Sequence, residues 1–460
     1  MIDVSRMVSR ITSPFGDAVA PRGGEVGAKR RVRGPSFAPR LGQGPLTLTL
    51  SPLADAVAPR GEGTLGRSRV KSRLLLRLLP LAASLLFSGA AFSAEVKIGY
   101  LGLQDDPRYH PDLVYTRIEI APGGNPIDGA TMGVEEMKVV SDAVDQQVVL
   151  DHQEATDAAS LVAKLDEMVK AGEQFVILDL PAELVDQVAG QTREWPVTLL
   201  NATAPEDYLR QRCYPNLLHT AASDRMLSDA MVQLLRTRNW TKVLMLVGAE
   251  PRDKAMAAAF RASAERQRFN IVDEREFTLA TDPANRERNN SLLITGNADY
   301  DVVFVADHQG EFSRYLPYDT QLPRLVVGST GLVAAEWQWS WDRDGSTQVT
   351  SRFETLTKGR RMTGQDWSSW IAAKAIVTAY AKARTGEYQK IADYIRGNRL
   401  KIDGAKGVQL NFRPWDGQMR FPIVLATHNA VIAEAPLEGF LHQTNVLDTL
   451  GTDEPEHKCQ

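Results

Sequence analysis

Polar residues that follow short apolar runs form the candidate binding site of this sequence. Ligands of open parallel sheets bind beyond the carboxyl ends of the strands, so these positions are the ones that could contact a solute. The acidic residues among them, Asp105, Asp106 and Asp179, would suit a cation, an amine or a polyol. In the first half of the chain the candidates are Gln104, Asp105, Asp179, Asn201, Ala202 and Thr203. In the second half they are Glu250, Asp307, His308 and Thr330.

Catalytic and metal-binding patterns are not found in the sequence. It has no GxSxG, HExxH or GxxxxGK motif, no GxGxxG after a strand, and no pair of histidines four residues apart. The segment 342–346 (DRDGS) resembles the start of a calcium loop, but Gly345 comes too early for an EF-hand, so we interpret it as a turn. We therefore expect a binding protein rather than an enzyme, with no catalytic residue, metal or cofactor.

Several candidates have a structural alternative. Thr203 could cap the following helix, and Asp105 or Asp106 could cap a turn beside Pro107. His308 is a lone histidine, which more often serves as a contact or core group than as an acid or base. The segment 337–341 (WQWSW) places three tryptophans at alternate positions, where they could stack on a ligand or pack in the core.

The elements that must position these residues alternate between strand and helix. Apolar runs at 96–102, 146–153, 174–180 and 196–203 are separated by helical patterns, which predicts a parallel sheet covered by helices. A second series begins at Ser223, a good N-cap, and places apolar runs at 243–248, 269–277, 301–307 and 324–330. The predicted fold is α/β, with two Rossmann-like or flavodoxin-like lobes, a hinge and a central cleft.

The domain boundaries follow from this alternation. We expect lobe 1 to comprise 94–217 plus 345–400, and lobe 2 to comprise 218–330 plus 408–445, with a C-terminal tail at 446–460. Helices are predicted at 366–383 and 388–396. Two strands joined by the turn at 413–418 are then expected to end the compact part. The hinge would lie near 217–222, 329–341 and 399–408, where the chain crosses between lobes.

The segment 67–93 has the three parts of an export signal peptide. Basic residues precede a short apolar core at 78–87, and the small-x-small pattern at 91–93 fits a cleavage site. The apolar core is too short for a spanning helix, although an uncleaved anchor and a buried helix remain alternatives. Residues 1–66 contain a near-repeat of GDAVAPRG, and we expect translation to begin near Val70; a disordered basic extension is the other interpretation.

The net charge limits the partners of the chain, and the two cysteines could form a disulfide if the chain is exported. The chain has 53 basic and 57 acidic residues, and residues 1–93 hold 14 and 5 of them, which leaves a net charge of −13 for 94–460. Such an acidic chain argues against nucleic acid or an anionic membrane as a partner. Cys213 and Cys459 are the two cysteines, and an oxidising compartment would allow one disulfide between them; two free thiols are the alternative.

The order of elements and one local motif resemble type I periplasmic solute-binding proteins of the branched-chain amino acid ABC transporter class. The segment NATAPEDYLRQRCYPNLLHTAASDRM (201–226) carries the loop after the fourth strand and the crossing to the second lobe. The resemblance covers about 94–445 and implies a periplasmic binding protein-like fold of type I. It also implies that Ala202 and Thr203 hydrogen-bond a ligand carboxylate or hydroxyl. At 178–184, however, LDLPAEL stands where amino acid binders carry a Ser- and Gly-rich loop, so an α-amino acid ligand is in doubt.

Two further segments resemble a narrower branch. IGYLGLQDDPRY (98–109) and RPWDGQMR (413–420) are similar to proteins associated with quinoprotein (PQQ-dependent) alcohol dehydrogenase systems. The resemblance implies a periplasmic substrate-binding protein that captures a small molecule by hinge closure and delivers it to an ABC permease in the inner membrane. The alternative is a ligand-sensing or partner protein of quinoprotein dehydrogenase components, without transport. An exported enzyme on the same fold is a third alternative.

Overall fold

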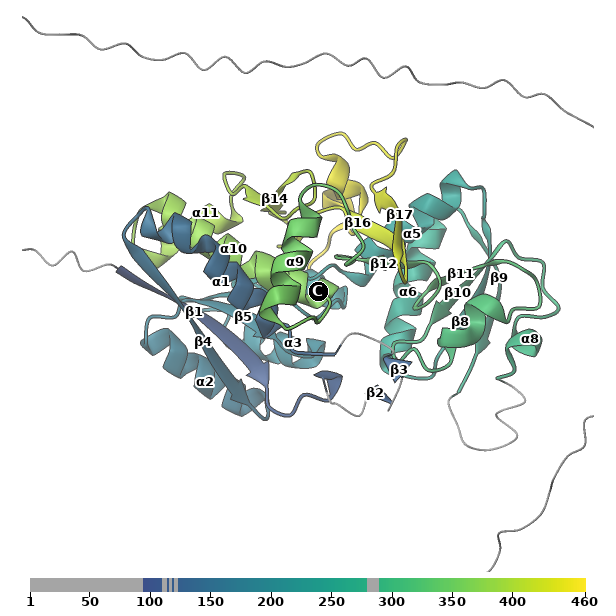
Figure 1. Cartoon of the computed structure of the whole chain (residues 1–460), viewed down its shortest axis with the longest axis horizontal. Coiled ribbons are helices and arrows are strands. Elements are labelled where there is room, and N and C mark those ends of the chain that lie inside the picture. The colour runs from purple at the N-terminus through teal and green to yellow at the C-terminus, as the bar shows by residue number, and fades with distance from the viewer. Residues whose placement is uncertain (1–93, 110–113, 116–117, 120–122, 279–288) are drawn as a thin grey trace, which may run out of the picture. The chain divides into compact units, whose positions relative to one another are not determined.

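The computed structural model describes residues 94–460 apart from 110–113, 116–117, 120–122 and 279–288 (Figure 1). The predicted extension at 1–66 and the predicted signal peptide at 67–93 lie outside the described residues. Among the helices that are described, none is both long and apolar enough to cross a membrane.

The first sheet is parallel throughout, in the strand order β4-β1-β5-β6-β7. Its strands β5, β6 and β7 are buried along their whole length, as helices on the two faces of a parallel sheet require, whereas the edge strand β4 is partly exposed. The sequence predicted this alternation of strands and helices. The strands are β1 (Ala94–Leu103), β4 (Gln146–Ala155), β5 (Phe175–Asp179), β6 (Thr198–Asn201) and β7 (Leu217–His219).

Helices cover both faces of this sheet (Figure 1). Ile98 and Ile177 pack in a core shared with α1 (Ile127–Asp142) and α10 (Gly364–Ala383). The neighbouring strand residues Val176 and Leu178 point the other way, toward α2 (Ala158–Lys170) and α3 (Ala182–Gln191). Successive strand side chains point to opposite faces, so each strand contributes to two cores.

The sequence analysis expected a helix between the first two strands without giving its bounds, and the packing of this helix, α1, depends on two glycines. A Cβ atom on Gly129 would lie 2.0 Å from the backbone oxygen of Asp366, and one on Gly133 would lie 2.7 Å from that of Trp370. Both partners belong to α10, so α1 and α10 approach closely only because these two positions have no side chain. Glycine is unfavourable inside helices, so propensity alone does not indicate this element.

The second sheet is also parallel, in the order β11-β10-β8-β9. Ser223 begins the helix before it, because its side-chain oxygen accepts a hydrogen bond from the backbone N–H of Met226 at 3.2 Å, as the sequence predicted. The elements are α5 (Asp224–Thr237), β8 (Lys242–Val247), α6 (Pro251–Arg266), β9 (Asn270–Glu276), α8 (Ser291–Ile294), β10 (Val302–Ala306) and β11 (Leu325–Gly328).

The C-terminal third forms two small antiparallel sheets, β12-β16-β17 and β13-β14-β15, and a two-stranded pair, β2-β3, lies in the first half of the chain. Their strands are β2 (Val114–Tyr115), β3 (Ile118–Glu119), β12 (Val333–Ala335), β13 (Ile402–Asp403), β14 (Gln409–Phe412), β15 (Met419–Arg420), β16 (Ile423–Thr427) and β17 (Ala430–Ala435). The remaining helices are α4 (Tyr208–Gln211), α9 (Ser346–Leu356) and α11 (Tyr388–Arg396), with 3-10 turns at Pro107–Tyr109, Ser313–Tyr318, Val446–Thr449 and Glu454–Glu456.

The hairpin β14–β15 contacts the elements of the first sheet. It packs beside α11, and the backbone N–H of His219 in β7 donates to the oxygen of Gly417 at 2.9 Å. The sequence analysis assigned 408–445 as a whole to lobe 2. In the structure, β16 pairs with β12, whereas the hairpin β14–β15 forms a small sheet of its own with β13.

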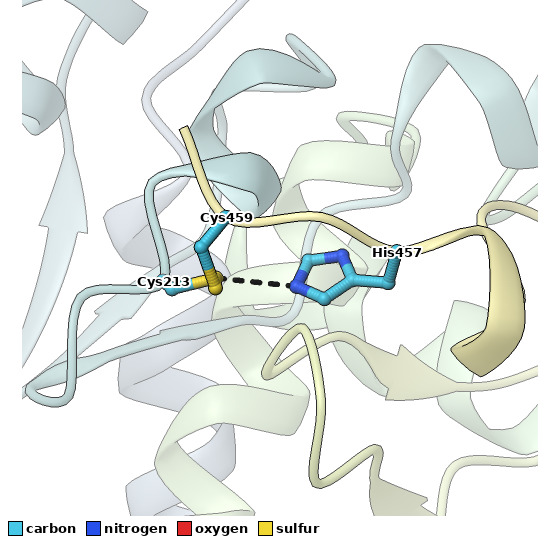
Figure 2. The surroundings of a disulfide bond; sticks show 3 residues. All are labelled: Cys213, His457 and Cys459. Carbon is cyan, nitrogen blue, oxygen red and sulfur yellow. Dashed lines mark hydrogen bonds between the residues drawn. A yellow bond between two sulfur atoms is a disulfide. The ribbon is translucent and has the colours of Figure 1, made fainter.

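The tail is packed, which corrects the expectation that the hairpin ends the compact part. Asp448 is 1% exposed and its carboxylate binds two guanidinium groups, those of Arg413 at 2.9 Å and Arg420 at 2.7 Å. In the structure, Cys213 and Cys459 form a disulfide across a sequence separation of 246 residues, and His457 Nε2 lies 3.2 Å from the sulfur of Cys213 (Figure 2). The tail is therefore fixed at both of its ends.

The three segments predicted as the hinge meet at one partly buried residue, Glu336. The backbone N–H of Ala222 donates to Glu336 Oε1 at 3.0 Å, and the Lys406 ammonium donates to the backbone oxygen of Glu336. Burial raises the pKa of Glu336 and lowers the pKa of Lys406 to about 8. Trp337 and Trp341 beside it are 3% and 4% exposed, so these two rings serve core packing.

Candidate functional site

A single guanidinium joins the strand ends of the first sheet. Arg108 lies in the short 3-10 turn after β1, and its Nη2 donates to Asp106 at 2.6 Å and to Asp179 at 2.9 Å. Its Nη1 donates to the hydroxyl of Thr203 at 3.1 Å. We call Asp106, Arg108, Tyr109, Asp179 and Thr203 the Arg108 cluster. The parallel pairing of β1 with β5, which sets Gly102 opposite Asp179, brings the loop after β1 to this place.

Asp179 in this cluster is fully paired. Besides Arg108, its carboxylate accepts hydrogen bonds from the hydroxyls of Tyr109 at 2.7 Å and Tyr100 at 3.0 Å. Its side chain is 2% exposed, whereas that of Arg108 is 25% exposed. The sequence analysis treated Asp179 as an acidic group open to a cationic ligand. In the structure, the groups that remain accessible are the outer part of the guanidinium and the half-buried ring of Tyr109.

Burial and neighbouring charges together shift the pKa values of three residues at the Arg108 cluster. Burial raises the pKa of Tyr109 and of Tyr100, and the Asp179 carboxylate raises both further. The two phenols therefore stay protonated and keep donating to Asp179 across the physiological range. Although burial opposes its charge, the pKa of Arg108 is raised, because Tyr109, Asp106 and Asp179 favour the guanidinium form. The cluster therefore brings two carboxylates, one guanidinium and the phenol of Tyr109 together at one strand-end edge.

The other first-sheet candidates have more local roles. Asn201 is fully buried, and its side chain accepts from the backbone N–H of Thr203 and Ala204 while donating to the oxygen of Ala204 at 2.7 Å. It therefore shapes the loop, and the side chain of Ala202 is buried beneath it. Thr203 does not cap the next helix, because α4 begins after Asp207. Gln104 and Asp105 are exposed in a turn, which Asp106 caps by accepting from the Arg108 backbone N–H at 2.9 Å.

The strand ends of the second sheet are organised around a different acid. Asp253, in the first turn of α6, accepts hydrogen bonds from the backbone N–H of His308 at 2.7 Å and of Glu250 at 3.3 Å. The imidazole Nδ1 of His308 lies 2.8 Å from the same carboxylate. Asp253 is 3% exposed, while Glu250 and His308 are exposed. The acid therefore holds two loops in place and orients the accessible imidazole of His308.

Asp307 and the residues after β11 complete this second edge. Asp307 is 2% exposed; its carboxylate accepts from the backbone N–H of Ser313 at 2.8 Å, and its own N–H donates to the Ser329 hydroxyl at 2.8 Å. Thr330 is partly buried beside it. Within the described residues, no hydrogen bond or ion pair joins the candidates of one sheet to those of the other.

The sequence analysis missed Arg108, Tyr109, Tyr100 and Asp253 as site residues. Arg108 and Tyr109 carried a signal, because they lie in the segment 98–109 whose resemblance was noted and follow the first strand by a few residues. Tyr100 could not be found this way, because it lies inside the strand. Asp253 falls in the first turn of a predicted helix, where an acidic residue is ordinarily read as a cap.

Comparison with known proteins supports the fold directly. Residues 148–316 match the model of the receptor family ligand binding region. The leucine-, isoleucine-, valine-, threonine- and alanine-binding protein from Brucella ovis in its closed conformation superimposes with a TM-score of 0.62 at 12% identity, over 80% of this chain and 98% of that one. An ABC transporter substrate-binding protein from Sphaerobacter thermophilus gives 0.60 at 14% identity, over 74% and 98%.

A third solved structure contains a bound ligand. The solute-binding protein of an ABC transporter from Rhodopseudomonas palustris, in complex with 3,4-dihydroxybenzoic acid, gives a TM-score of 0.56 at 12% identity, over 74% of this chain and 97% of that one. Among the curated proteins, no relative matches this sequence. The chain has the two-lobed α/β fold of the type I periplasmic binding proteins, as the sequence predicted.

Proposed function

We propose that this chain is the periplasmic substrate-binding protein of an ABC importer and captures a small solute between its two lobes. The observation that carries this proposal is the Arg108 cluster, which stands at the carboxyl ends of β1, β5 and β6. Solutes of open parallel sheets bind at that edge. Two sheets of this kind in one chain supply two such edges for one ligand.

The charge state of the cluster narrows the ligand class. Asp106 and Asp179 already accept charged or phenolic hydrogen bonds, so neither carboxylate is free to pair with a cationic ligand. The Ser- and Gly-rich loop that would hold an amino acid carboxylate is replaced by 178–184. A neutral, hydroxyl-bearing solute fits best, because it can accept from the exposed part of Arg108, which Thr203 holds in place, and donate to the hydroxyl oxygen of Tyr109.

Hinge closure would couple binding to delivery. A ligand that contacts both edges stabilises the closed arrangement and shifts the equilibrium between open and closed forms. The three crossing segments that meet at Glu336 are the natural hinge, since they connect the lobes and contain Lys406 and Ala222 in mutual contact through Glu336. An inner-membrane permease would then recognise the closed form. The periplasmic location rests on the predicted signal peptide at 67–93.

One observation also favours a second candidate function. The segment 98–109, which resembles proteins of PQQ-dependent alcohol dehydrogenase systems, is the same segment that supplies Tyr100, Asp106, Arg108 and Tyr109 to the cluster. The binding site itself therefore carries the narrower resemblance. The alternative is a periplasmic ligand-sensing or partner protein of quinoprotein dehydrogenase components, which would bind the same solute without delivering it to a permease.

A ligand panel read by two methods tests the proposal. Thermal unfolding of the purified protein should rise in midpoint with at least one polyol or alcohol in a panel that also contains amines, amino acids and metal ions. Small-angle X-ray scattering should show a smaller radius of gyration with that ligand than without it. Thr203→Val should weaken the thermal response, and Thr237→Val, on the far end of α5, is the control. The absence of any response across the panel would contradict solute capture.

A further inference from the structure

A cavity lies beside the disulfide between Cys213 and Cys459, and none of its lining residues belongs to the Arg108 cluster. Its volume is about 290 Å³, and it is bounded by the loop at 213–215, β7, the end of α11, the hairpin turn at 413–417 and the tail residue Cys459. Typical small-molecule sites occupy roughly 300–1,000 Å³, so this cavity suits a small ligand. The disulfide in Figure 2 fixes one of its walls, because both Cys213 and Cys459 line it.

The charged lining of this cavity is strongly basic. Arg210, Arg396 and Arg413 line it, against the single carboxylate of Asp416. The chain as a whole is acidic, with a net charge of −4, so a concentration of guanidinium groups at one cavity departs from the general surface. Low-dielectric walls strengthen the attraction of such a cavity for an anion.

The hydrogen-bonding capacity of the three arginines differs. Arg210 is satisfied, because its guanidinium donates to Gln418 and to the backbone oxygens of Ala204, Glu206 and Ala221. Arg413 binds Asp448 but keeps one buried nitrogen, Nη1, without a hydrogen-bond acceptor; the nearest carboxylate oxygen, on Asp416, is 3.5 Å away. A buried donor without an acceptor is costly, so a ligand oxygen there would be stabilising.

Arg396 is the unpaired cation of the cavity. It is the last residue of α11 and is partly buried, yet it forms no hydrogen bond and no ion pair with any described residue. Burial lowers the pKa of its guanidinium, and Tyr388 and Asp393 offset this only in part. A bound anion would remove that penalty, because it would supply the missing counter-charge.

The aromatic lining indicates the body of the ligand. Tyr214 and Trp415 line the cavity, and their polar tips are already occupied: the Tyr214 hydroxyl donates to Asp186 at 2.8 Å and the Trp415 indole N–H donates to the oxygen of Thr452 at 3.1 Å. Both rings therefore offer apolar surface to an occupant. Flat apolar groups pack well against such rings, and a carboxylate matches the planar fork of a guanidinium.

We propose that this cavity is a second ligand site, distinct from the strand-end site, and that it binds a small carboxylic acid with a flat apolar body through Arg396. The proposal does not depend on solute capture at the Arg108 cluster, because the two sites share no residue. A ligand here would bridge α11, the hairpin turn and the disulfide-anchored tail, and so would link the tail to the first sheet.

Calorimetric titration with benzoate tests the proposal on the purified full-length protein. Wild type should bind benzoate at millimolar or lower concentrations, and the neutral isostere benzamide should bind at least about tenfold more weakly, since it lacks the charge that Arg396 pairs. Arg396→Gln should weaken benzoate binding by about tenfold or more. Arg399→Gln removes a guanidinium three residues away, outside the cavity, and should leave the affinity within about twofold.

Three results would overturn the proposal. They are no heat of binding with benzoate, equal affinity of wild type for benzoate and benzamide, and unchanged benzoate affinity in Arg396→Gln. Thr203→Val separates the two sites: it should leave benzoate binding unchanged, and a loss there would place benzoate at the Arg108 cluster instead. Thermal unfolding of both arginine variants checks folding, and the benzamide comparison on wild type stands whether or not Arg396→Gln folds.

Discussion

The two parallel sheets end in polar residues of similar type, but the residues at the two edges are used differently. At the first sheet, the Arg108 guanidinium donates hydrogen bonds to two carboxylates and one hydroxyl, and part of the guanidinium stays accessible. At the second sheet, Asp253 and Asp307 accept mainly from backbone N–H groups of nearby loops. The first edge is built to present a charged group, and the second is built mainly to hold loops in place.

This difference shows that position at a strand end locates a candidate residue without defining its role. Asp179 and Asp307 occupy equivalent positions and are equally buried, at 2% exposure. Asp179 contacts a guanidinium and two phenols, whereas Asp307 contacts the backbone. The side-chain partners of Asp179 belong to a site that could bind a ligand, whereas the backbone partner of Asp307 stabilises a loop. Substitutions at the two edges should therefore separate effects on ligand binding from effects on stability.

The largest effect is expected from Arg108→Met. Removing the cation leaves Asp106 and Asp179 buried without their counter-charge, which should lower the free energy of unfolding by about 3–5 kcal/mol and abolish ligand binding. Arg108→Lys should recover part of the stability, because it restores the charge without the bidentate geometry. Denaturant unfolding measures both variants. Lys97→Met, which removes the exposed ion pair with Glu95, is the control. A loss of stability in Arg108→Met smaller than that of the control would contradict the central role of Arg108.

Lys406, in one of the segments predicted as the hinge, should show the next largest effect, as a pH dependence of the free energy of unfolding. Burial lowers the pKa of Lys406 to about 8 in the folded protein, below its ordinary value of 10.5, so the unfolded chain binds more protons between these values. Stability should therefore rise as pH increases from about 8 to 10.5, by about 2–3 kcal/mol for this group. Lys406→Met should remove that rise. Parallel pH profiles of the two proteins would show that Lys406 is not the group responsible.

Asp253→Ala should disturb the second edge without affecting the first. It leaves the backbone N–H groups of His308 and Glu250 without their acceptor, which should cost about 2 kcal/mol of stability. Ligand affinity should fall less than in Thr203→Val, because the Arg108 cluster is intact and only the contacts of the second edge are displaced. Denaturant unfolding and calorimetry with the ligand found by the panel measure the two quantities. A loss of affinity as large as that of Arg108→Met would place the main ligand contacts at the second edge instead.

Thr203→Val has the opposite pattern. The hydroxyl accepts one hydrogen bond from Arg108, so its loss should cost about 1 kcal/mol of stability. Ligand affinity should fall by about tenfold, because the hydroxyl fixes the position of the guanidinium that binds the ligand. Calorimetry on Thr203→Ser, which restores the hydroxyl, should return the affinity to near the wild-type value. Failure of that rescue would assign the effect to packing rather than to the hydroxyl.

Glu250→Gln should have the smallest effect. The side chain is exposed and its backbone N–H, rather than its carboxylate, makes the contact with Asp253. Stability should stay within about 0.5 kcal/mol of wild type, and ligand affinity should not change measurably. If affinity fell, the exposed carboxylate would itself be a ligand contact, and the second edge would be a binding surface in its own right.

The sequence predicted the sheets but not the partners of their terminal residues. Apolar runs with intervening helical patterns are local signals, and β1, β5, β8 and β10 appear where those signals placed them. The contact between Arg108 and Asp179 spans 71 residues and depends on the pairing of β1 with β5, which a single sequence does not reveal. The site could therefore be located approximately, and its charge balance could not.

Two other features were predicted incompletely for related reasons. Helix α1 relies on Gly129 and Gly133 for contact with α10, and glycine lowers the helix signal that propensity provides. The tail after Ala435 has little periodicity, yet Asp448 is buried because Arg413 and Arg420 form its counter-charge. Both features are tertiary: each depends on a partner more than 25 residues away that the local pattern does not indicate.

Native mass spectrometry of the protein purified from its own cells under non-denaturing conditions tests the central claim most directly. The account predicts that wild type carries a small neutral organic molecule as a mass adduct, that Arg108→Met carries none, and that Asp253→Ala retains it. The adduct mass would give the formula of the solute. An unliganded wild-type protein, or an adduct that Arg108→Met retains in full, would contradict solute capture at the Arg108 cluster.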